Sequence, residues 1–237
     1  MSDITRAEIC VTACADLFAG AGETLASPMG LIPSLGAKLA RLTTEPDLLL
    51  SDGEAFLLTP ESTVEGWLPY RKVFDVVAHG RRHVVMGANQ VDRFGNQNIS
   101  AIGDHARPTR QLLGVRGAPG NTINHRTSYW VPRHSPRVLV NAVDVVSGVG
   151  YDHAVGPFHD VHRVVTNLAV LGFDTPDRSM RLVSTHPGVS VDEVQEQTSF
   201  PLNTDNVTET RLPADEELEL IRTVLDPDAK RDREVPS

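Results

Sequence analysis

The chain has 237 residues, a length that suits one large α/β domain or two small ones, and its 40% hydrophobic and 22% charged residues are ordinary for a globular protein. Its formal net charge of −9 argues against a nucleic-acid surface, which needs clustered lysine and arginine. No stretch approaches the ~18 to 20 apolar residues of a membrane helix, and the first residues lack the basic start of a signal peptide. We therefore expect a cytoplasmic protein that binds neither nucleic acid nor a membrane.

The predicted elements begin with a helix. Thr5 and Glu8 form a capping-box pattern, and apolar residues then recur at helical spacing. A loop rich in proline and glycine follows, after which Ser34 is predicted to cap a second helix. The continuously apolar run at 47–50 indicates a buried parallel strand.

The same alternation continues along the chain. Further helices are predicted at 70–80, 191–198 and 214–225, and further strands at 83–87, 138–140, 163–169 and 180–184. This alternation favours the α/β class, as an open, mostly parallel sheet with flanking helices on both faces. We assign residues 1–225 to this domain, and residues 226–237, which are charged and contain two prolines, to a mobile tail.

Two loops stand where an open α/β sheet binds its ligands, beyond the carboxyl ends of strands. One is 51–54, and the other is the glycine-bearing segment 115–121. Glycine allows close approach of the backbone, so Gly53, Gly117 and Gly120 are candidates for contact with a ligand. Ordinary turns remain the alternative interpretation.

The segment 87–98, with the sequence GANQVDRFGNQN, resembles a segment of the beta subunits of class I coenzyme A (CoA) transferases. Its physical content is a turn at 92–96 with Gly and Asn available for positive φ, while Gln90 and Asn98 can tie neighbouring loops by hydrogen bonds. Three further stretches are similar to that family in the same order, namely 30–50, 163–174 and 186–200.

The resemblance implies an α/β sheet fold, an obligatory alpha subunit in a heterodimer or α2β2 heterotetramer, and an acyl-CoA substrate. CoA is then part of the substrate, and no separate cofactor is implied. In the family, the beta subunit supplies a glutamate in an E-x-G context, whose carboxylate attacks the thioester and carries CoA covalently.

That position departs from the family pattern, because it reads Ser51-Asp52-Gly53. A serine hydroxyl would need a base beside it to act as a nucleophile. Asp52 lies one residue away and leaves the backbone in a different direction, and Glu54 would require a shift in the register of the loop. Ser51, Asp52 and Glu54 are nevertheless the candidate catalytic residues of this chain.

Loss of the glutamate predicts a reaction without a covalent enzyme–CoA intermediate. The resemblance is strongest to family members that open the last steroid ring of a cyclic keto acyl-CoA with water, a hydrolytic C–C cleavage that retains the thioester. The base that activates the water is then expected on the alpha subunit. Two alternatives remain open: a working CoA-transferase subunit that uses Asp52 or Glu54, and a non-catalytic scaffold or ligand-sensing domain.

Other polar residues have weaker functional interpretations. Asn98, Asn121 and Arg126 are candidates for contacts with the substrate or with CoA, since arginine suits phosphate and carboxylate groups, although a solvated surface loop explains Arg126 equally well.

No metal site is predicted. His153, His159 and His162 lack the spacing that places ligands on one helix face. Cys10 and Cys14, four residues apart on one helix, are expected to be small buried side chains.

Overall fold

The structure is a computed structural model that describes residues 4–53, 55–153 and 156–236. The chain divides into two compact units: unit 1 comprises residues 1–86 and 210–237, and unit 2 comprises residues 87–209. The sequence predicts a single domain over residues 1–225. The division falls where β5 ends, so unit 1 is built from both ends of the chain.

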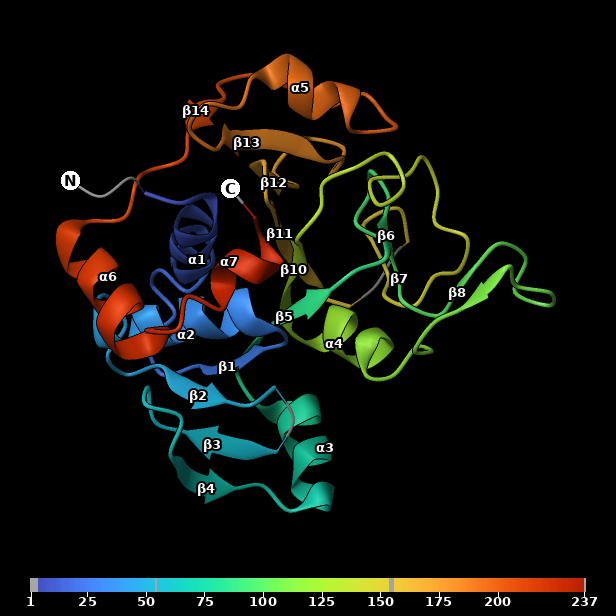
Figure 1. Ribbon diagram of the computed structural model, residues 1–237. Helices are drawn as coiled ribbons and strands as arrows, with labels where there is room; N and C mark the ends of the chain where they lie inside the picture. The colour runs from blue at the N-terminus through green and yellow to red at the C-terminus, as the bar shows by residue number, and fades with distance from the viewer. Residues whose placement is uncertain (1–3, 54, 154–155, 237) are drawn as a thin grey trace. The chain divides into compact units, whose positions relative to one another are not determined.

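Unit 1 contains a mixed sheet in which three strands are parallel and two are antiparallel. Its strands, in spatial order, are β5 (Arg82–Gly87), β1 (Leu25–Pro28), β2 (Leu49–Ser51), β3 (Phe56–Leu58) and β4 (Val64–Trp67). Strand β1 pairs in parallel with both β5 and β2, and β3 and β4 continue the sheet as antiparallel hairpins (Figure 1). The expected open α/β sheet is confirmed. Strands β1, β3 and β4 were not predicted, because each is only three or four residues long.

Two helices of unit 1 pack closely on each other. Helix α1 (Arg6–Asp16) has the predicted capping box, and α2 (Leu31–Leu42) packs on α1 and on strands β1 and β2. A Cβ atom on Gly36 of α2 would lie only 2.6 Å from the Cβ of Cys14, so this approach requires glycine. Cys10 and Cys14 are buried free thiols, as expected.

Helix α2 begins earlier than predicted. Its N-cap is Gly30, whose φ is 108°, rather than Ser34. Pro33 does not delay the helix, because proline is tolerated in a first helical turn, where backbone N–H groups have no intrahelical acceptor. Helix α3 (Tyr70–His79) lies where the sequence pattern placed it.

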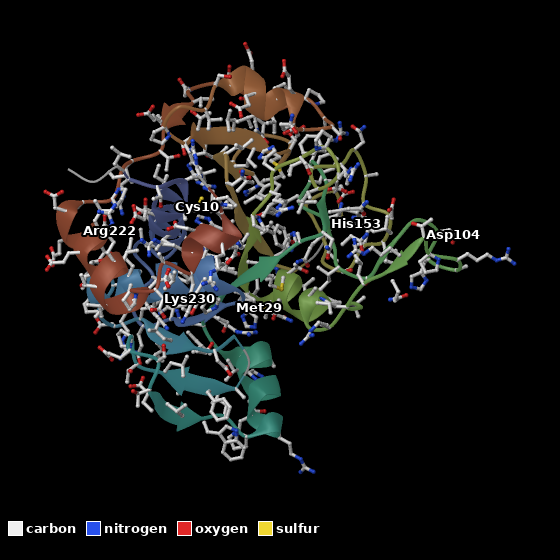
Figure 2. The ribbon with its side chains drawn as sticks, viewed as in Figure 1. Cys10, Met29, Asp104, His153, Arg222 and Lys230 are labelled. Atoms are coloured by element: carbon white, nitrogen blue, oxygen red, sulfur yellow. The ribbon has the colours of Figure 1, made fainter. Side chains whose placement is uncertain are left out.

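The carboxyl-terminal residues fold onto helix α1 of the same unit. The predicted helix 214–225 is α6 (Asp215–Glu219) followed by a π-helical turn, η1 (Leu220–Leu225), and α7 (Arg231–Glu234) comes after it. Arg222, labelled in Figure 2, donates from Nε to Glu8 Oε1 at 2.6 Å, and Arg231 Nη2 donates to the same oxygen at 2.9 Å. Residues 226–237 were expected to be a mobile tail. The described part, 226–236, is instead held by ion pairs at Arg231, whose side chain is buried.

Unit 2 contains a mixed sheet and two small hairpins. The sheet strands, in spatial order, are β10 (Arg126–Val131), β11 (Asp160–Thr166), β12 (Ala169–Gly172), β13 (Arg181–Thr185) and β14 (Thr208–Glu209). The hairpins are β6 (Gln90–Val91) with β7 (Gln97–Asn98), and β8 (Ala101–Ile102) with β9 (Arg110–Gln111). Strands β10 and β11 are parallel, whereas β11, β12 and β13 form an antiparallel meander.

Two strands predicted in unit 2 differ from those observed. The predicted strand 163–169 contains a turn between β11 and β12, and residues 138–140 form only an isolated bridge from Val91 to Leu139. Helix α5 (Val191–Glu196) is capped by Ser190, as predicted. In neither unit is any described helix both long and apolar enough to span a bilayer.

Candidate active site

The Ser51 position lies at the carboxyl end of strand β2. The pairing of Ala26 with Leu50 places the next residues of the two strands, Ser27 and Ser51, side by side. Both side chains are almost fully buried, at 1% and 3% exposure. This is the edge of a parallel sheet at which α/β proteins bind their ligands.

The hydroxyl of Ser51 has three hydrogen-bonding contacts within unit 1. Its Oγ lies 2.9 Å from the Ala26 carbonyl oxygen and 3.2 Å from Ser27 Oγ, and it accepts the Gly53 N–H at 3.2 Å. The single hydroxyl proton goes to the carbonyl, which can only accept. A backbone carbonyl is not a base, so nothing in these contacts activates Ser51 as a nucleophile.

The carboxylate of Asp52 closes the turn between β2 and β3. Its Oδ1 accepts the N–H groups of Ala55 at 2.9 Å and Phe56 at 3.1 Å, and the Asp52 N–H donates to the Phe56 carbonyl at 3.0 Å. The side chain therefore folds back onto its own hairpin, as short acidic residues commonly do in turns. Glu54, the other candidate carboxylate, lies outside the described residues.

Gly53 is required by close backbone packing. Its φ is +90°, and an added Cβ would lie 2.8 Å from the Pro28 carbonyl oxygen. The loop after β2 thus lies directly against the turn that follows β1, where Met29 is labelled in Figure 2 and Gly30 begins helix α2. The positive φ and the close approach to Pro28 account for glycine at this position, and contact of Gly53 with a ligand stays a prediction.

A buried arginine that was not predicted from the sequence stands behind this loop. Arg82, the first residue of β5, is 9% exposed and donates from Nε to Ser27 Oγ at 2.7 Å. Its Nη2 lies 3.5 Å from the Gly53 carbonyl oxygen, and burial lowers the pKa of its guanidinium to about 10. The only signal in the sequence was an arginine at the start of an apolar strand.

The second predicted glycine loop is largely a helix. Residues Ala118–Asn124 form α4, with Gly117 as its N-cap and Gly120 inside it. Pro119 is accommodated because it lies in the first turn. Asn121 is buried at 3% exposure, and its carbonyl oxygen accepts the Thr127 hydroxyl at 3.2 Å.

Arg126 and Asn98 have partners within unit 2. Arg126 Nε donates to Asp160 Oδ2 at 2.8 Å, across the amino ends of the parallel strands β10 and β11 and away from their ligand-binding edge. Asn98 is fully buried, and its Nδ2 donates to Gln90 Oε1 and to the Ala101 carbonyl, both at 2.7 Å. Asn98 ties loops together, as its motif suggested.

The three histidines contact different groups. His153 Nδ1 contacts Asp152 at 2.9 Å, His159 Nδ1 donates to the Thr122 carbonyl at 2.7 Å, and burial lowers the pKa of His162 to about 4. Within the part of the chain that the structure describes, no three His, Cys, Asp or Glu side chains are grouped to hold a metal ion.

The chain was compared with protein-family models and with curated proteins. No protein-family model matches the chain. It is 59% identical over 248 residues to the cholesterol ring-cleaving hydrolase IpdB subunit of Rhodococcus jostii (strain RHA1), covering 99% of this chain and 98% of that protein. It is also 31% identical over 219 residues to a 3-oxoadipate CoA-transferase subunit of Pseudomonas knackmussii, covering 81% of this chain and 83% of that protein.

Solved structures agree with these relatives. A chain of Rhodococcus jostii RHA1 IpdAB superposes with a TM-score of 0.94 at 58% identity, covering 100% of both chains. The decarboxylase AibA/AibB superposes with a TM-score of 0.84 at 26% identity, covering 99% of this chain and 100% of that one. The fold is thus that of a CoA-transferase-type subunit. Within that class, the chain belongs to the family of cholesterol ring-cleaving hydrolase IpdB subunits.

Proposed function

We propose that this chain is the beta subunit of a two-subunit enzyme that opens the last steroid ring of a cyclic keto acyl-CoA with water. The observation that carries the proposal is the state of residue 51. A carboxylate that holds CoA is replaced by a serine whose proton points to the Ala26 carbonyl. The 59% identity to a ring-cleaving hydrolase subunit supports the same reaction class.

The reaction balances with water as its only co-reactant. A water oxygen adds to the ring ketone, and the resulting alkoxide re-forms a carbonyl as the adjacent C–C bond breaks. The electron pair of that bond passes to the carbon beside the thioester as an enolate, which oriented donors stabilise and a proton then quenches. The ketone carbon becomes a carboxylate, and the C–S bond stays intact. CoA therefore enters and leaves as part of the substrate.

The partner is an alpha subunit of the same fold group, as a heterodimer or an α2β2 heterotetramer, in the cytoplasm. Activation of water requires a general base. The Ser51 hydroxyl is bound to a carbonyl, and the Asp52 carboxylate accepts two backbone N–H groups. We therefore assign the base to the alpha subunit.

The direct test is incubation of the co-purified complex with a cyclic β-keto acyl-CoA in H₂¹⁸O. We expect one ¹⁸O atom in the new carboxylate of a ring-opened product that still carries CoA. Release of free CoA, or exchange of CoA onto an added carboxylic acid, would contradict the proposal.

Variants at Ser51 and Asp52 separate this proposal from CoA transfer. Loss of a covalent nucleophile costs roughly 10⁴-fold or more in kcat. We expect Ser51→Ala to lose only about tenfold, because it removes a positioning hydrogen bond, and Asp52→Asn, which keeps the Oδ1 acceptor, to lose less than about threefold. A glutamyl- or aspartyl-CoA adduct trapped by hydroxylamine or borohydride on this chain would establish the transferase alternative instead.

A further inference from the structure

Three polar side chains project from one face of the unit 1 sheet. The β-sheet register pairs Leu25 of β1 with both Arg82 of β5 and Leu49 of β2. Ser27 and Ser51 lie two residues beyond Leu25 and Leu49, and side chains two residues apart on a strand share a face. Arg82 at the start of β5 therefore reaches along this face toward the carboxyl edge, where the two serines lie.

These side chains form a continuous hydrogen-bond chain. Arg82 Nε can only donate, so the Ser27 hydroxyl oxygen accepts there at 2.7 Å. Ser51 Oγ lies 3.2 Å from Ser27 Oγ, gives its proton to the Ala26 carbonyl and accepts the Gly53 N–H. The chain thus runs from the guanidinium to the backbone of the 51–53 loop.

The side chains of this hydrogen-bond chain are buried, so water competes little for their hydrogen bonds. Arg82 is 9% exposed, Ser27 1% and Ser51 3%. Burial lowers the pKa of the Arg82 guanidinium only to about 10, so it stays charged at neutral pH. In surroundings with little water, a charge polarises the hydroxyl groups bound to it and strengthens each hydrogen bond along the chain.

We propose that Arg82 is a positioning residue for the reaction, setting through Ser27 the orientation of the Ser51 hydroxyl and the path of the 51–53 loop. This inference rests on the proposed function, in which the acyl-CoA lies at this sheet edge. Errors of about 1 Å in the placement of reacting groups can cost roughly 100-fold in rate. A loop that is held incorrectly therefore affects turnover more than binding.

The test compares variants of the co-purified complex by kcat and KM for the cyclic keto acyl-CoA. Arg82→Met preserves the length of the side chain but removes the Nε donor and the charge, and Ser27→Ala breaks the chain at its second link. We expect each to lower kcat at least tenfold while KM changes less than about threefold. The matched control is Arg81→Met, because Arg81 is the neighbouring arginine with an exposed side chain, and it is expected to leave both constants unchanged.

Double variants distinguish a positioning chain from independent structural effects. Residues that act through one another show non-additive effects. We expect Ser27→Ala to cause no further loss of kcat in a Ser51→Ala background, and Arg82→Lys, which retains the charge, to recover part of the loss of Arg82→Met. Multiplied losses in the double variant overturn the proposal. If Arg82→Met does not assemble, the Ser27/Ser51 cycle decides alone.

Different results would refute the proposed function and the positioning role of Arg82. A wild-type complex that does not hydrolyse a cyclic keto acyl-CoA refutes the proposed function. A wild-type complex that does hydrolyse it, with Arg82→Met and Ser27→Ala as active as Arg81→Met, refutes only the positioning role.

Discussion

The 87–98 segment in unit 2 matches the CoA-transferase pattern closely, whereas the 51–53 loop in unit 1 occupies the position of the family's catalytic glutamate without carrying one. In the 87–98 segment, the polar side chains bind the chain itself: Asn96 Nδ2 donates to Asp92 Oδ2 and Asp152 Oδ1, both at 2.9 Å, and Asn96 Oδ1 accepts the Gly150 N–H at 2.8 Å. In the loop, the residue that defines the family's chemistry is absent. The best-matched motif therefore marks a folding element, and the mismatch marks the change in function.

The largest expected effect tests the folding role of the 87–98 segment. Asn96→Ala removes three hydrogen bonds from a side chain that is 2% exposed. It also removes the side-chain donor to Oδ2 of the buried Asp92, whose pKa burial already raises. We expect a loss of about 3 kcal/mol or more in the free energy of unfolding, measured by urea titration.

The matched control for that variant is Asn89→Ala, at an exposed position in the same segment. It should change the free energy of unfolding by less than about 0.5 kcal/mol. Equal effects of the two substitutions would mean that the 87–98 segment is not a folding element.

A second buried polar network in unit 2 predicts acid sensitivity. His134 contacts Thr166 and Thr198 hydroxyls at 3.0 and 2.9 Å, and burial, together with the neighbouring His186, lowers its pKa to about 4. The neutral imidazole is favoured in the folded state, so its stabilisation is complete above pH ~6.5 and is lost as the pH falls toward 4. Between pH 7.5 and 4.5 this amounts to about 2 to 3 kcal/mol.

Denaturant titrations at both pH values, with His134→Gln as the control, measure this effect. The variant should lose less stability than the wild type on acidification. An equal loss in both proteins would assign the acid sensitivity to other groups.

In the loop, Gly53→Ala tests whether the backbone conformation is required. The residue has φ +90°, and the added methyl group would meet the Pro28 carbonyl oxygen at 2.8 Å. We expect about 1 to 3 kcal/mol of destabilisation, together with a fall in kcat because the loop must shift. Gly87→Ala is the control, since nothing lies within 4 Å of its added Cβ. If both substitutions are neutral, the loop is more adaptable than its packing indicates.

The smallest expected effect concerns Arg126, which was predicted from the sequence to be a substrate-binding residue. Its partly exposed ion pair with Asp160 should contribute less than about 1 kcal/mol. Arg126→Ala and Asp160→Ala are expected to match each other in stability and to leave KM within about twofold of the wild type. A tenfold rise in KM for Arg126→Ala alone would instead establish the predicted role of Arg126 in substrate or CoA binding.

The sequence alone determined the features that depend on nearby residues. Three features were predictable because their hydrogen bonds join residues a few positions apart: the capping box of Thr5 and Glu8, the Ser190 cap and the turn at 92–96. The strand that ends at Ser51 was predictable from its continuous apolar run. Comparison with the family motif also showed that Ser51 replaces the glutamate, because such a replacement can be seen from the amino-acid sequence without a structure.

Only the tertiary structure decided which polar groups meet across long separations. Glu8 meets Arg222 and Arg231, more than two hundred residues away, and this contact turns a presumed tail into a packed segment. Arg82 reaches Ser27 because β1 pairs with β5, and no periodicity in the chain records that pairing. Strand order brings such partners together, and it results from the burial of apolar faces over the whole unit rather than from any local pattern.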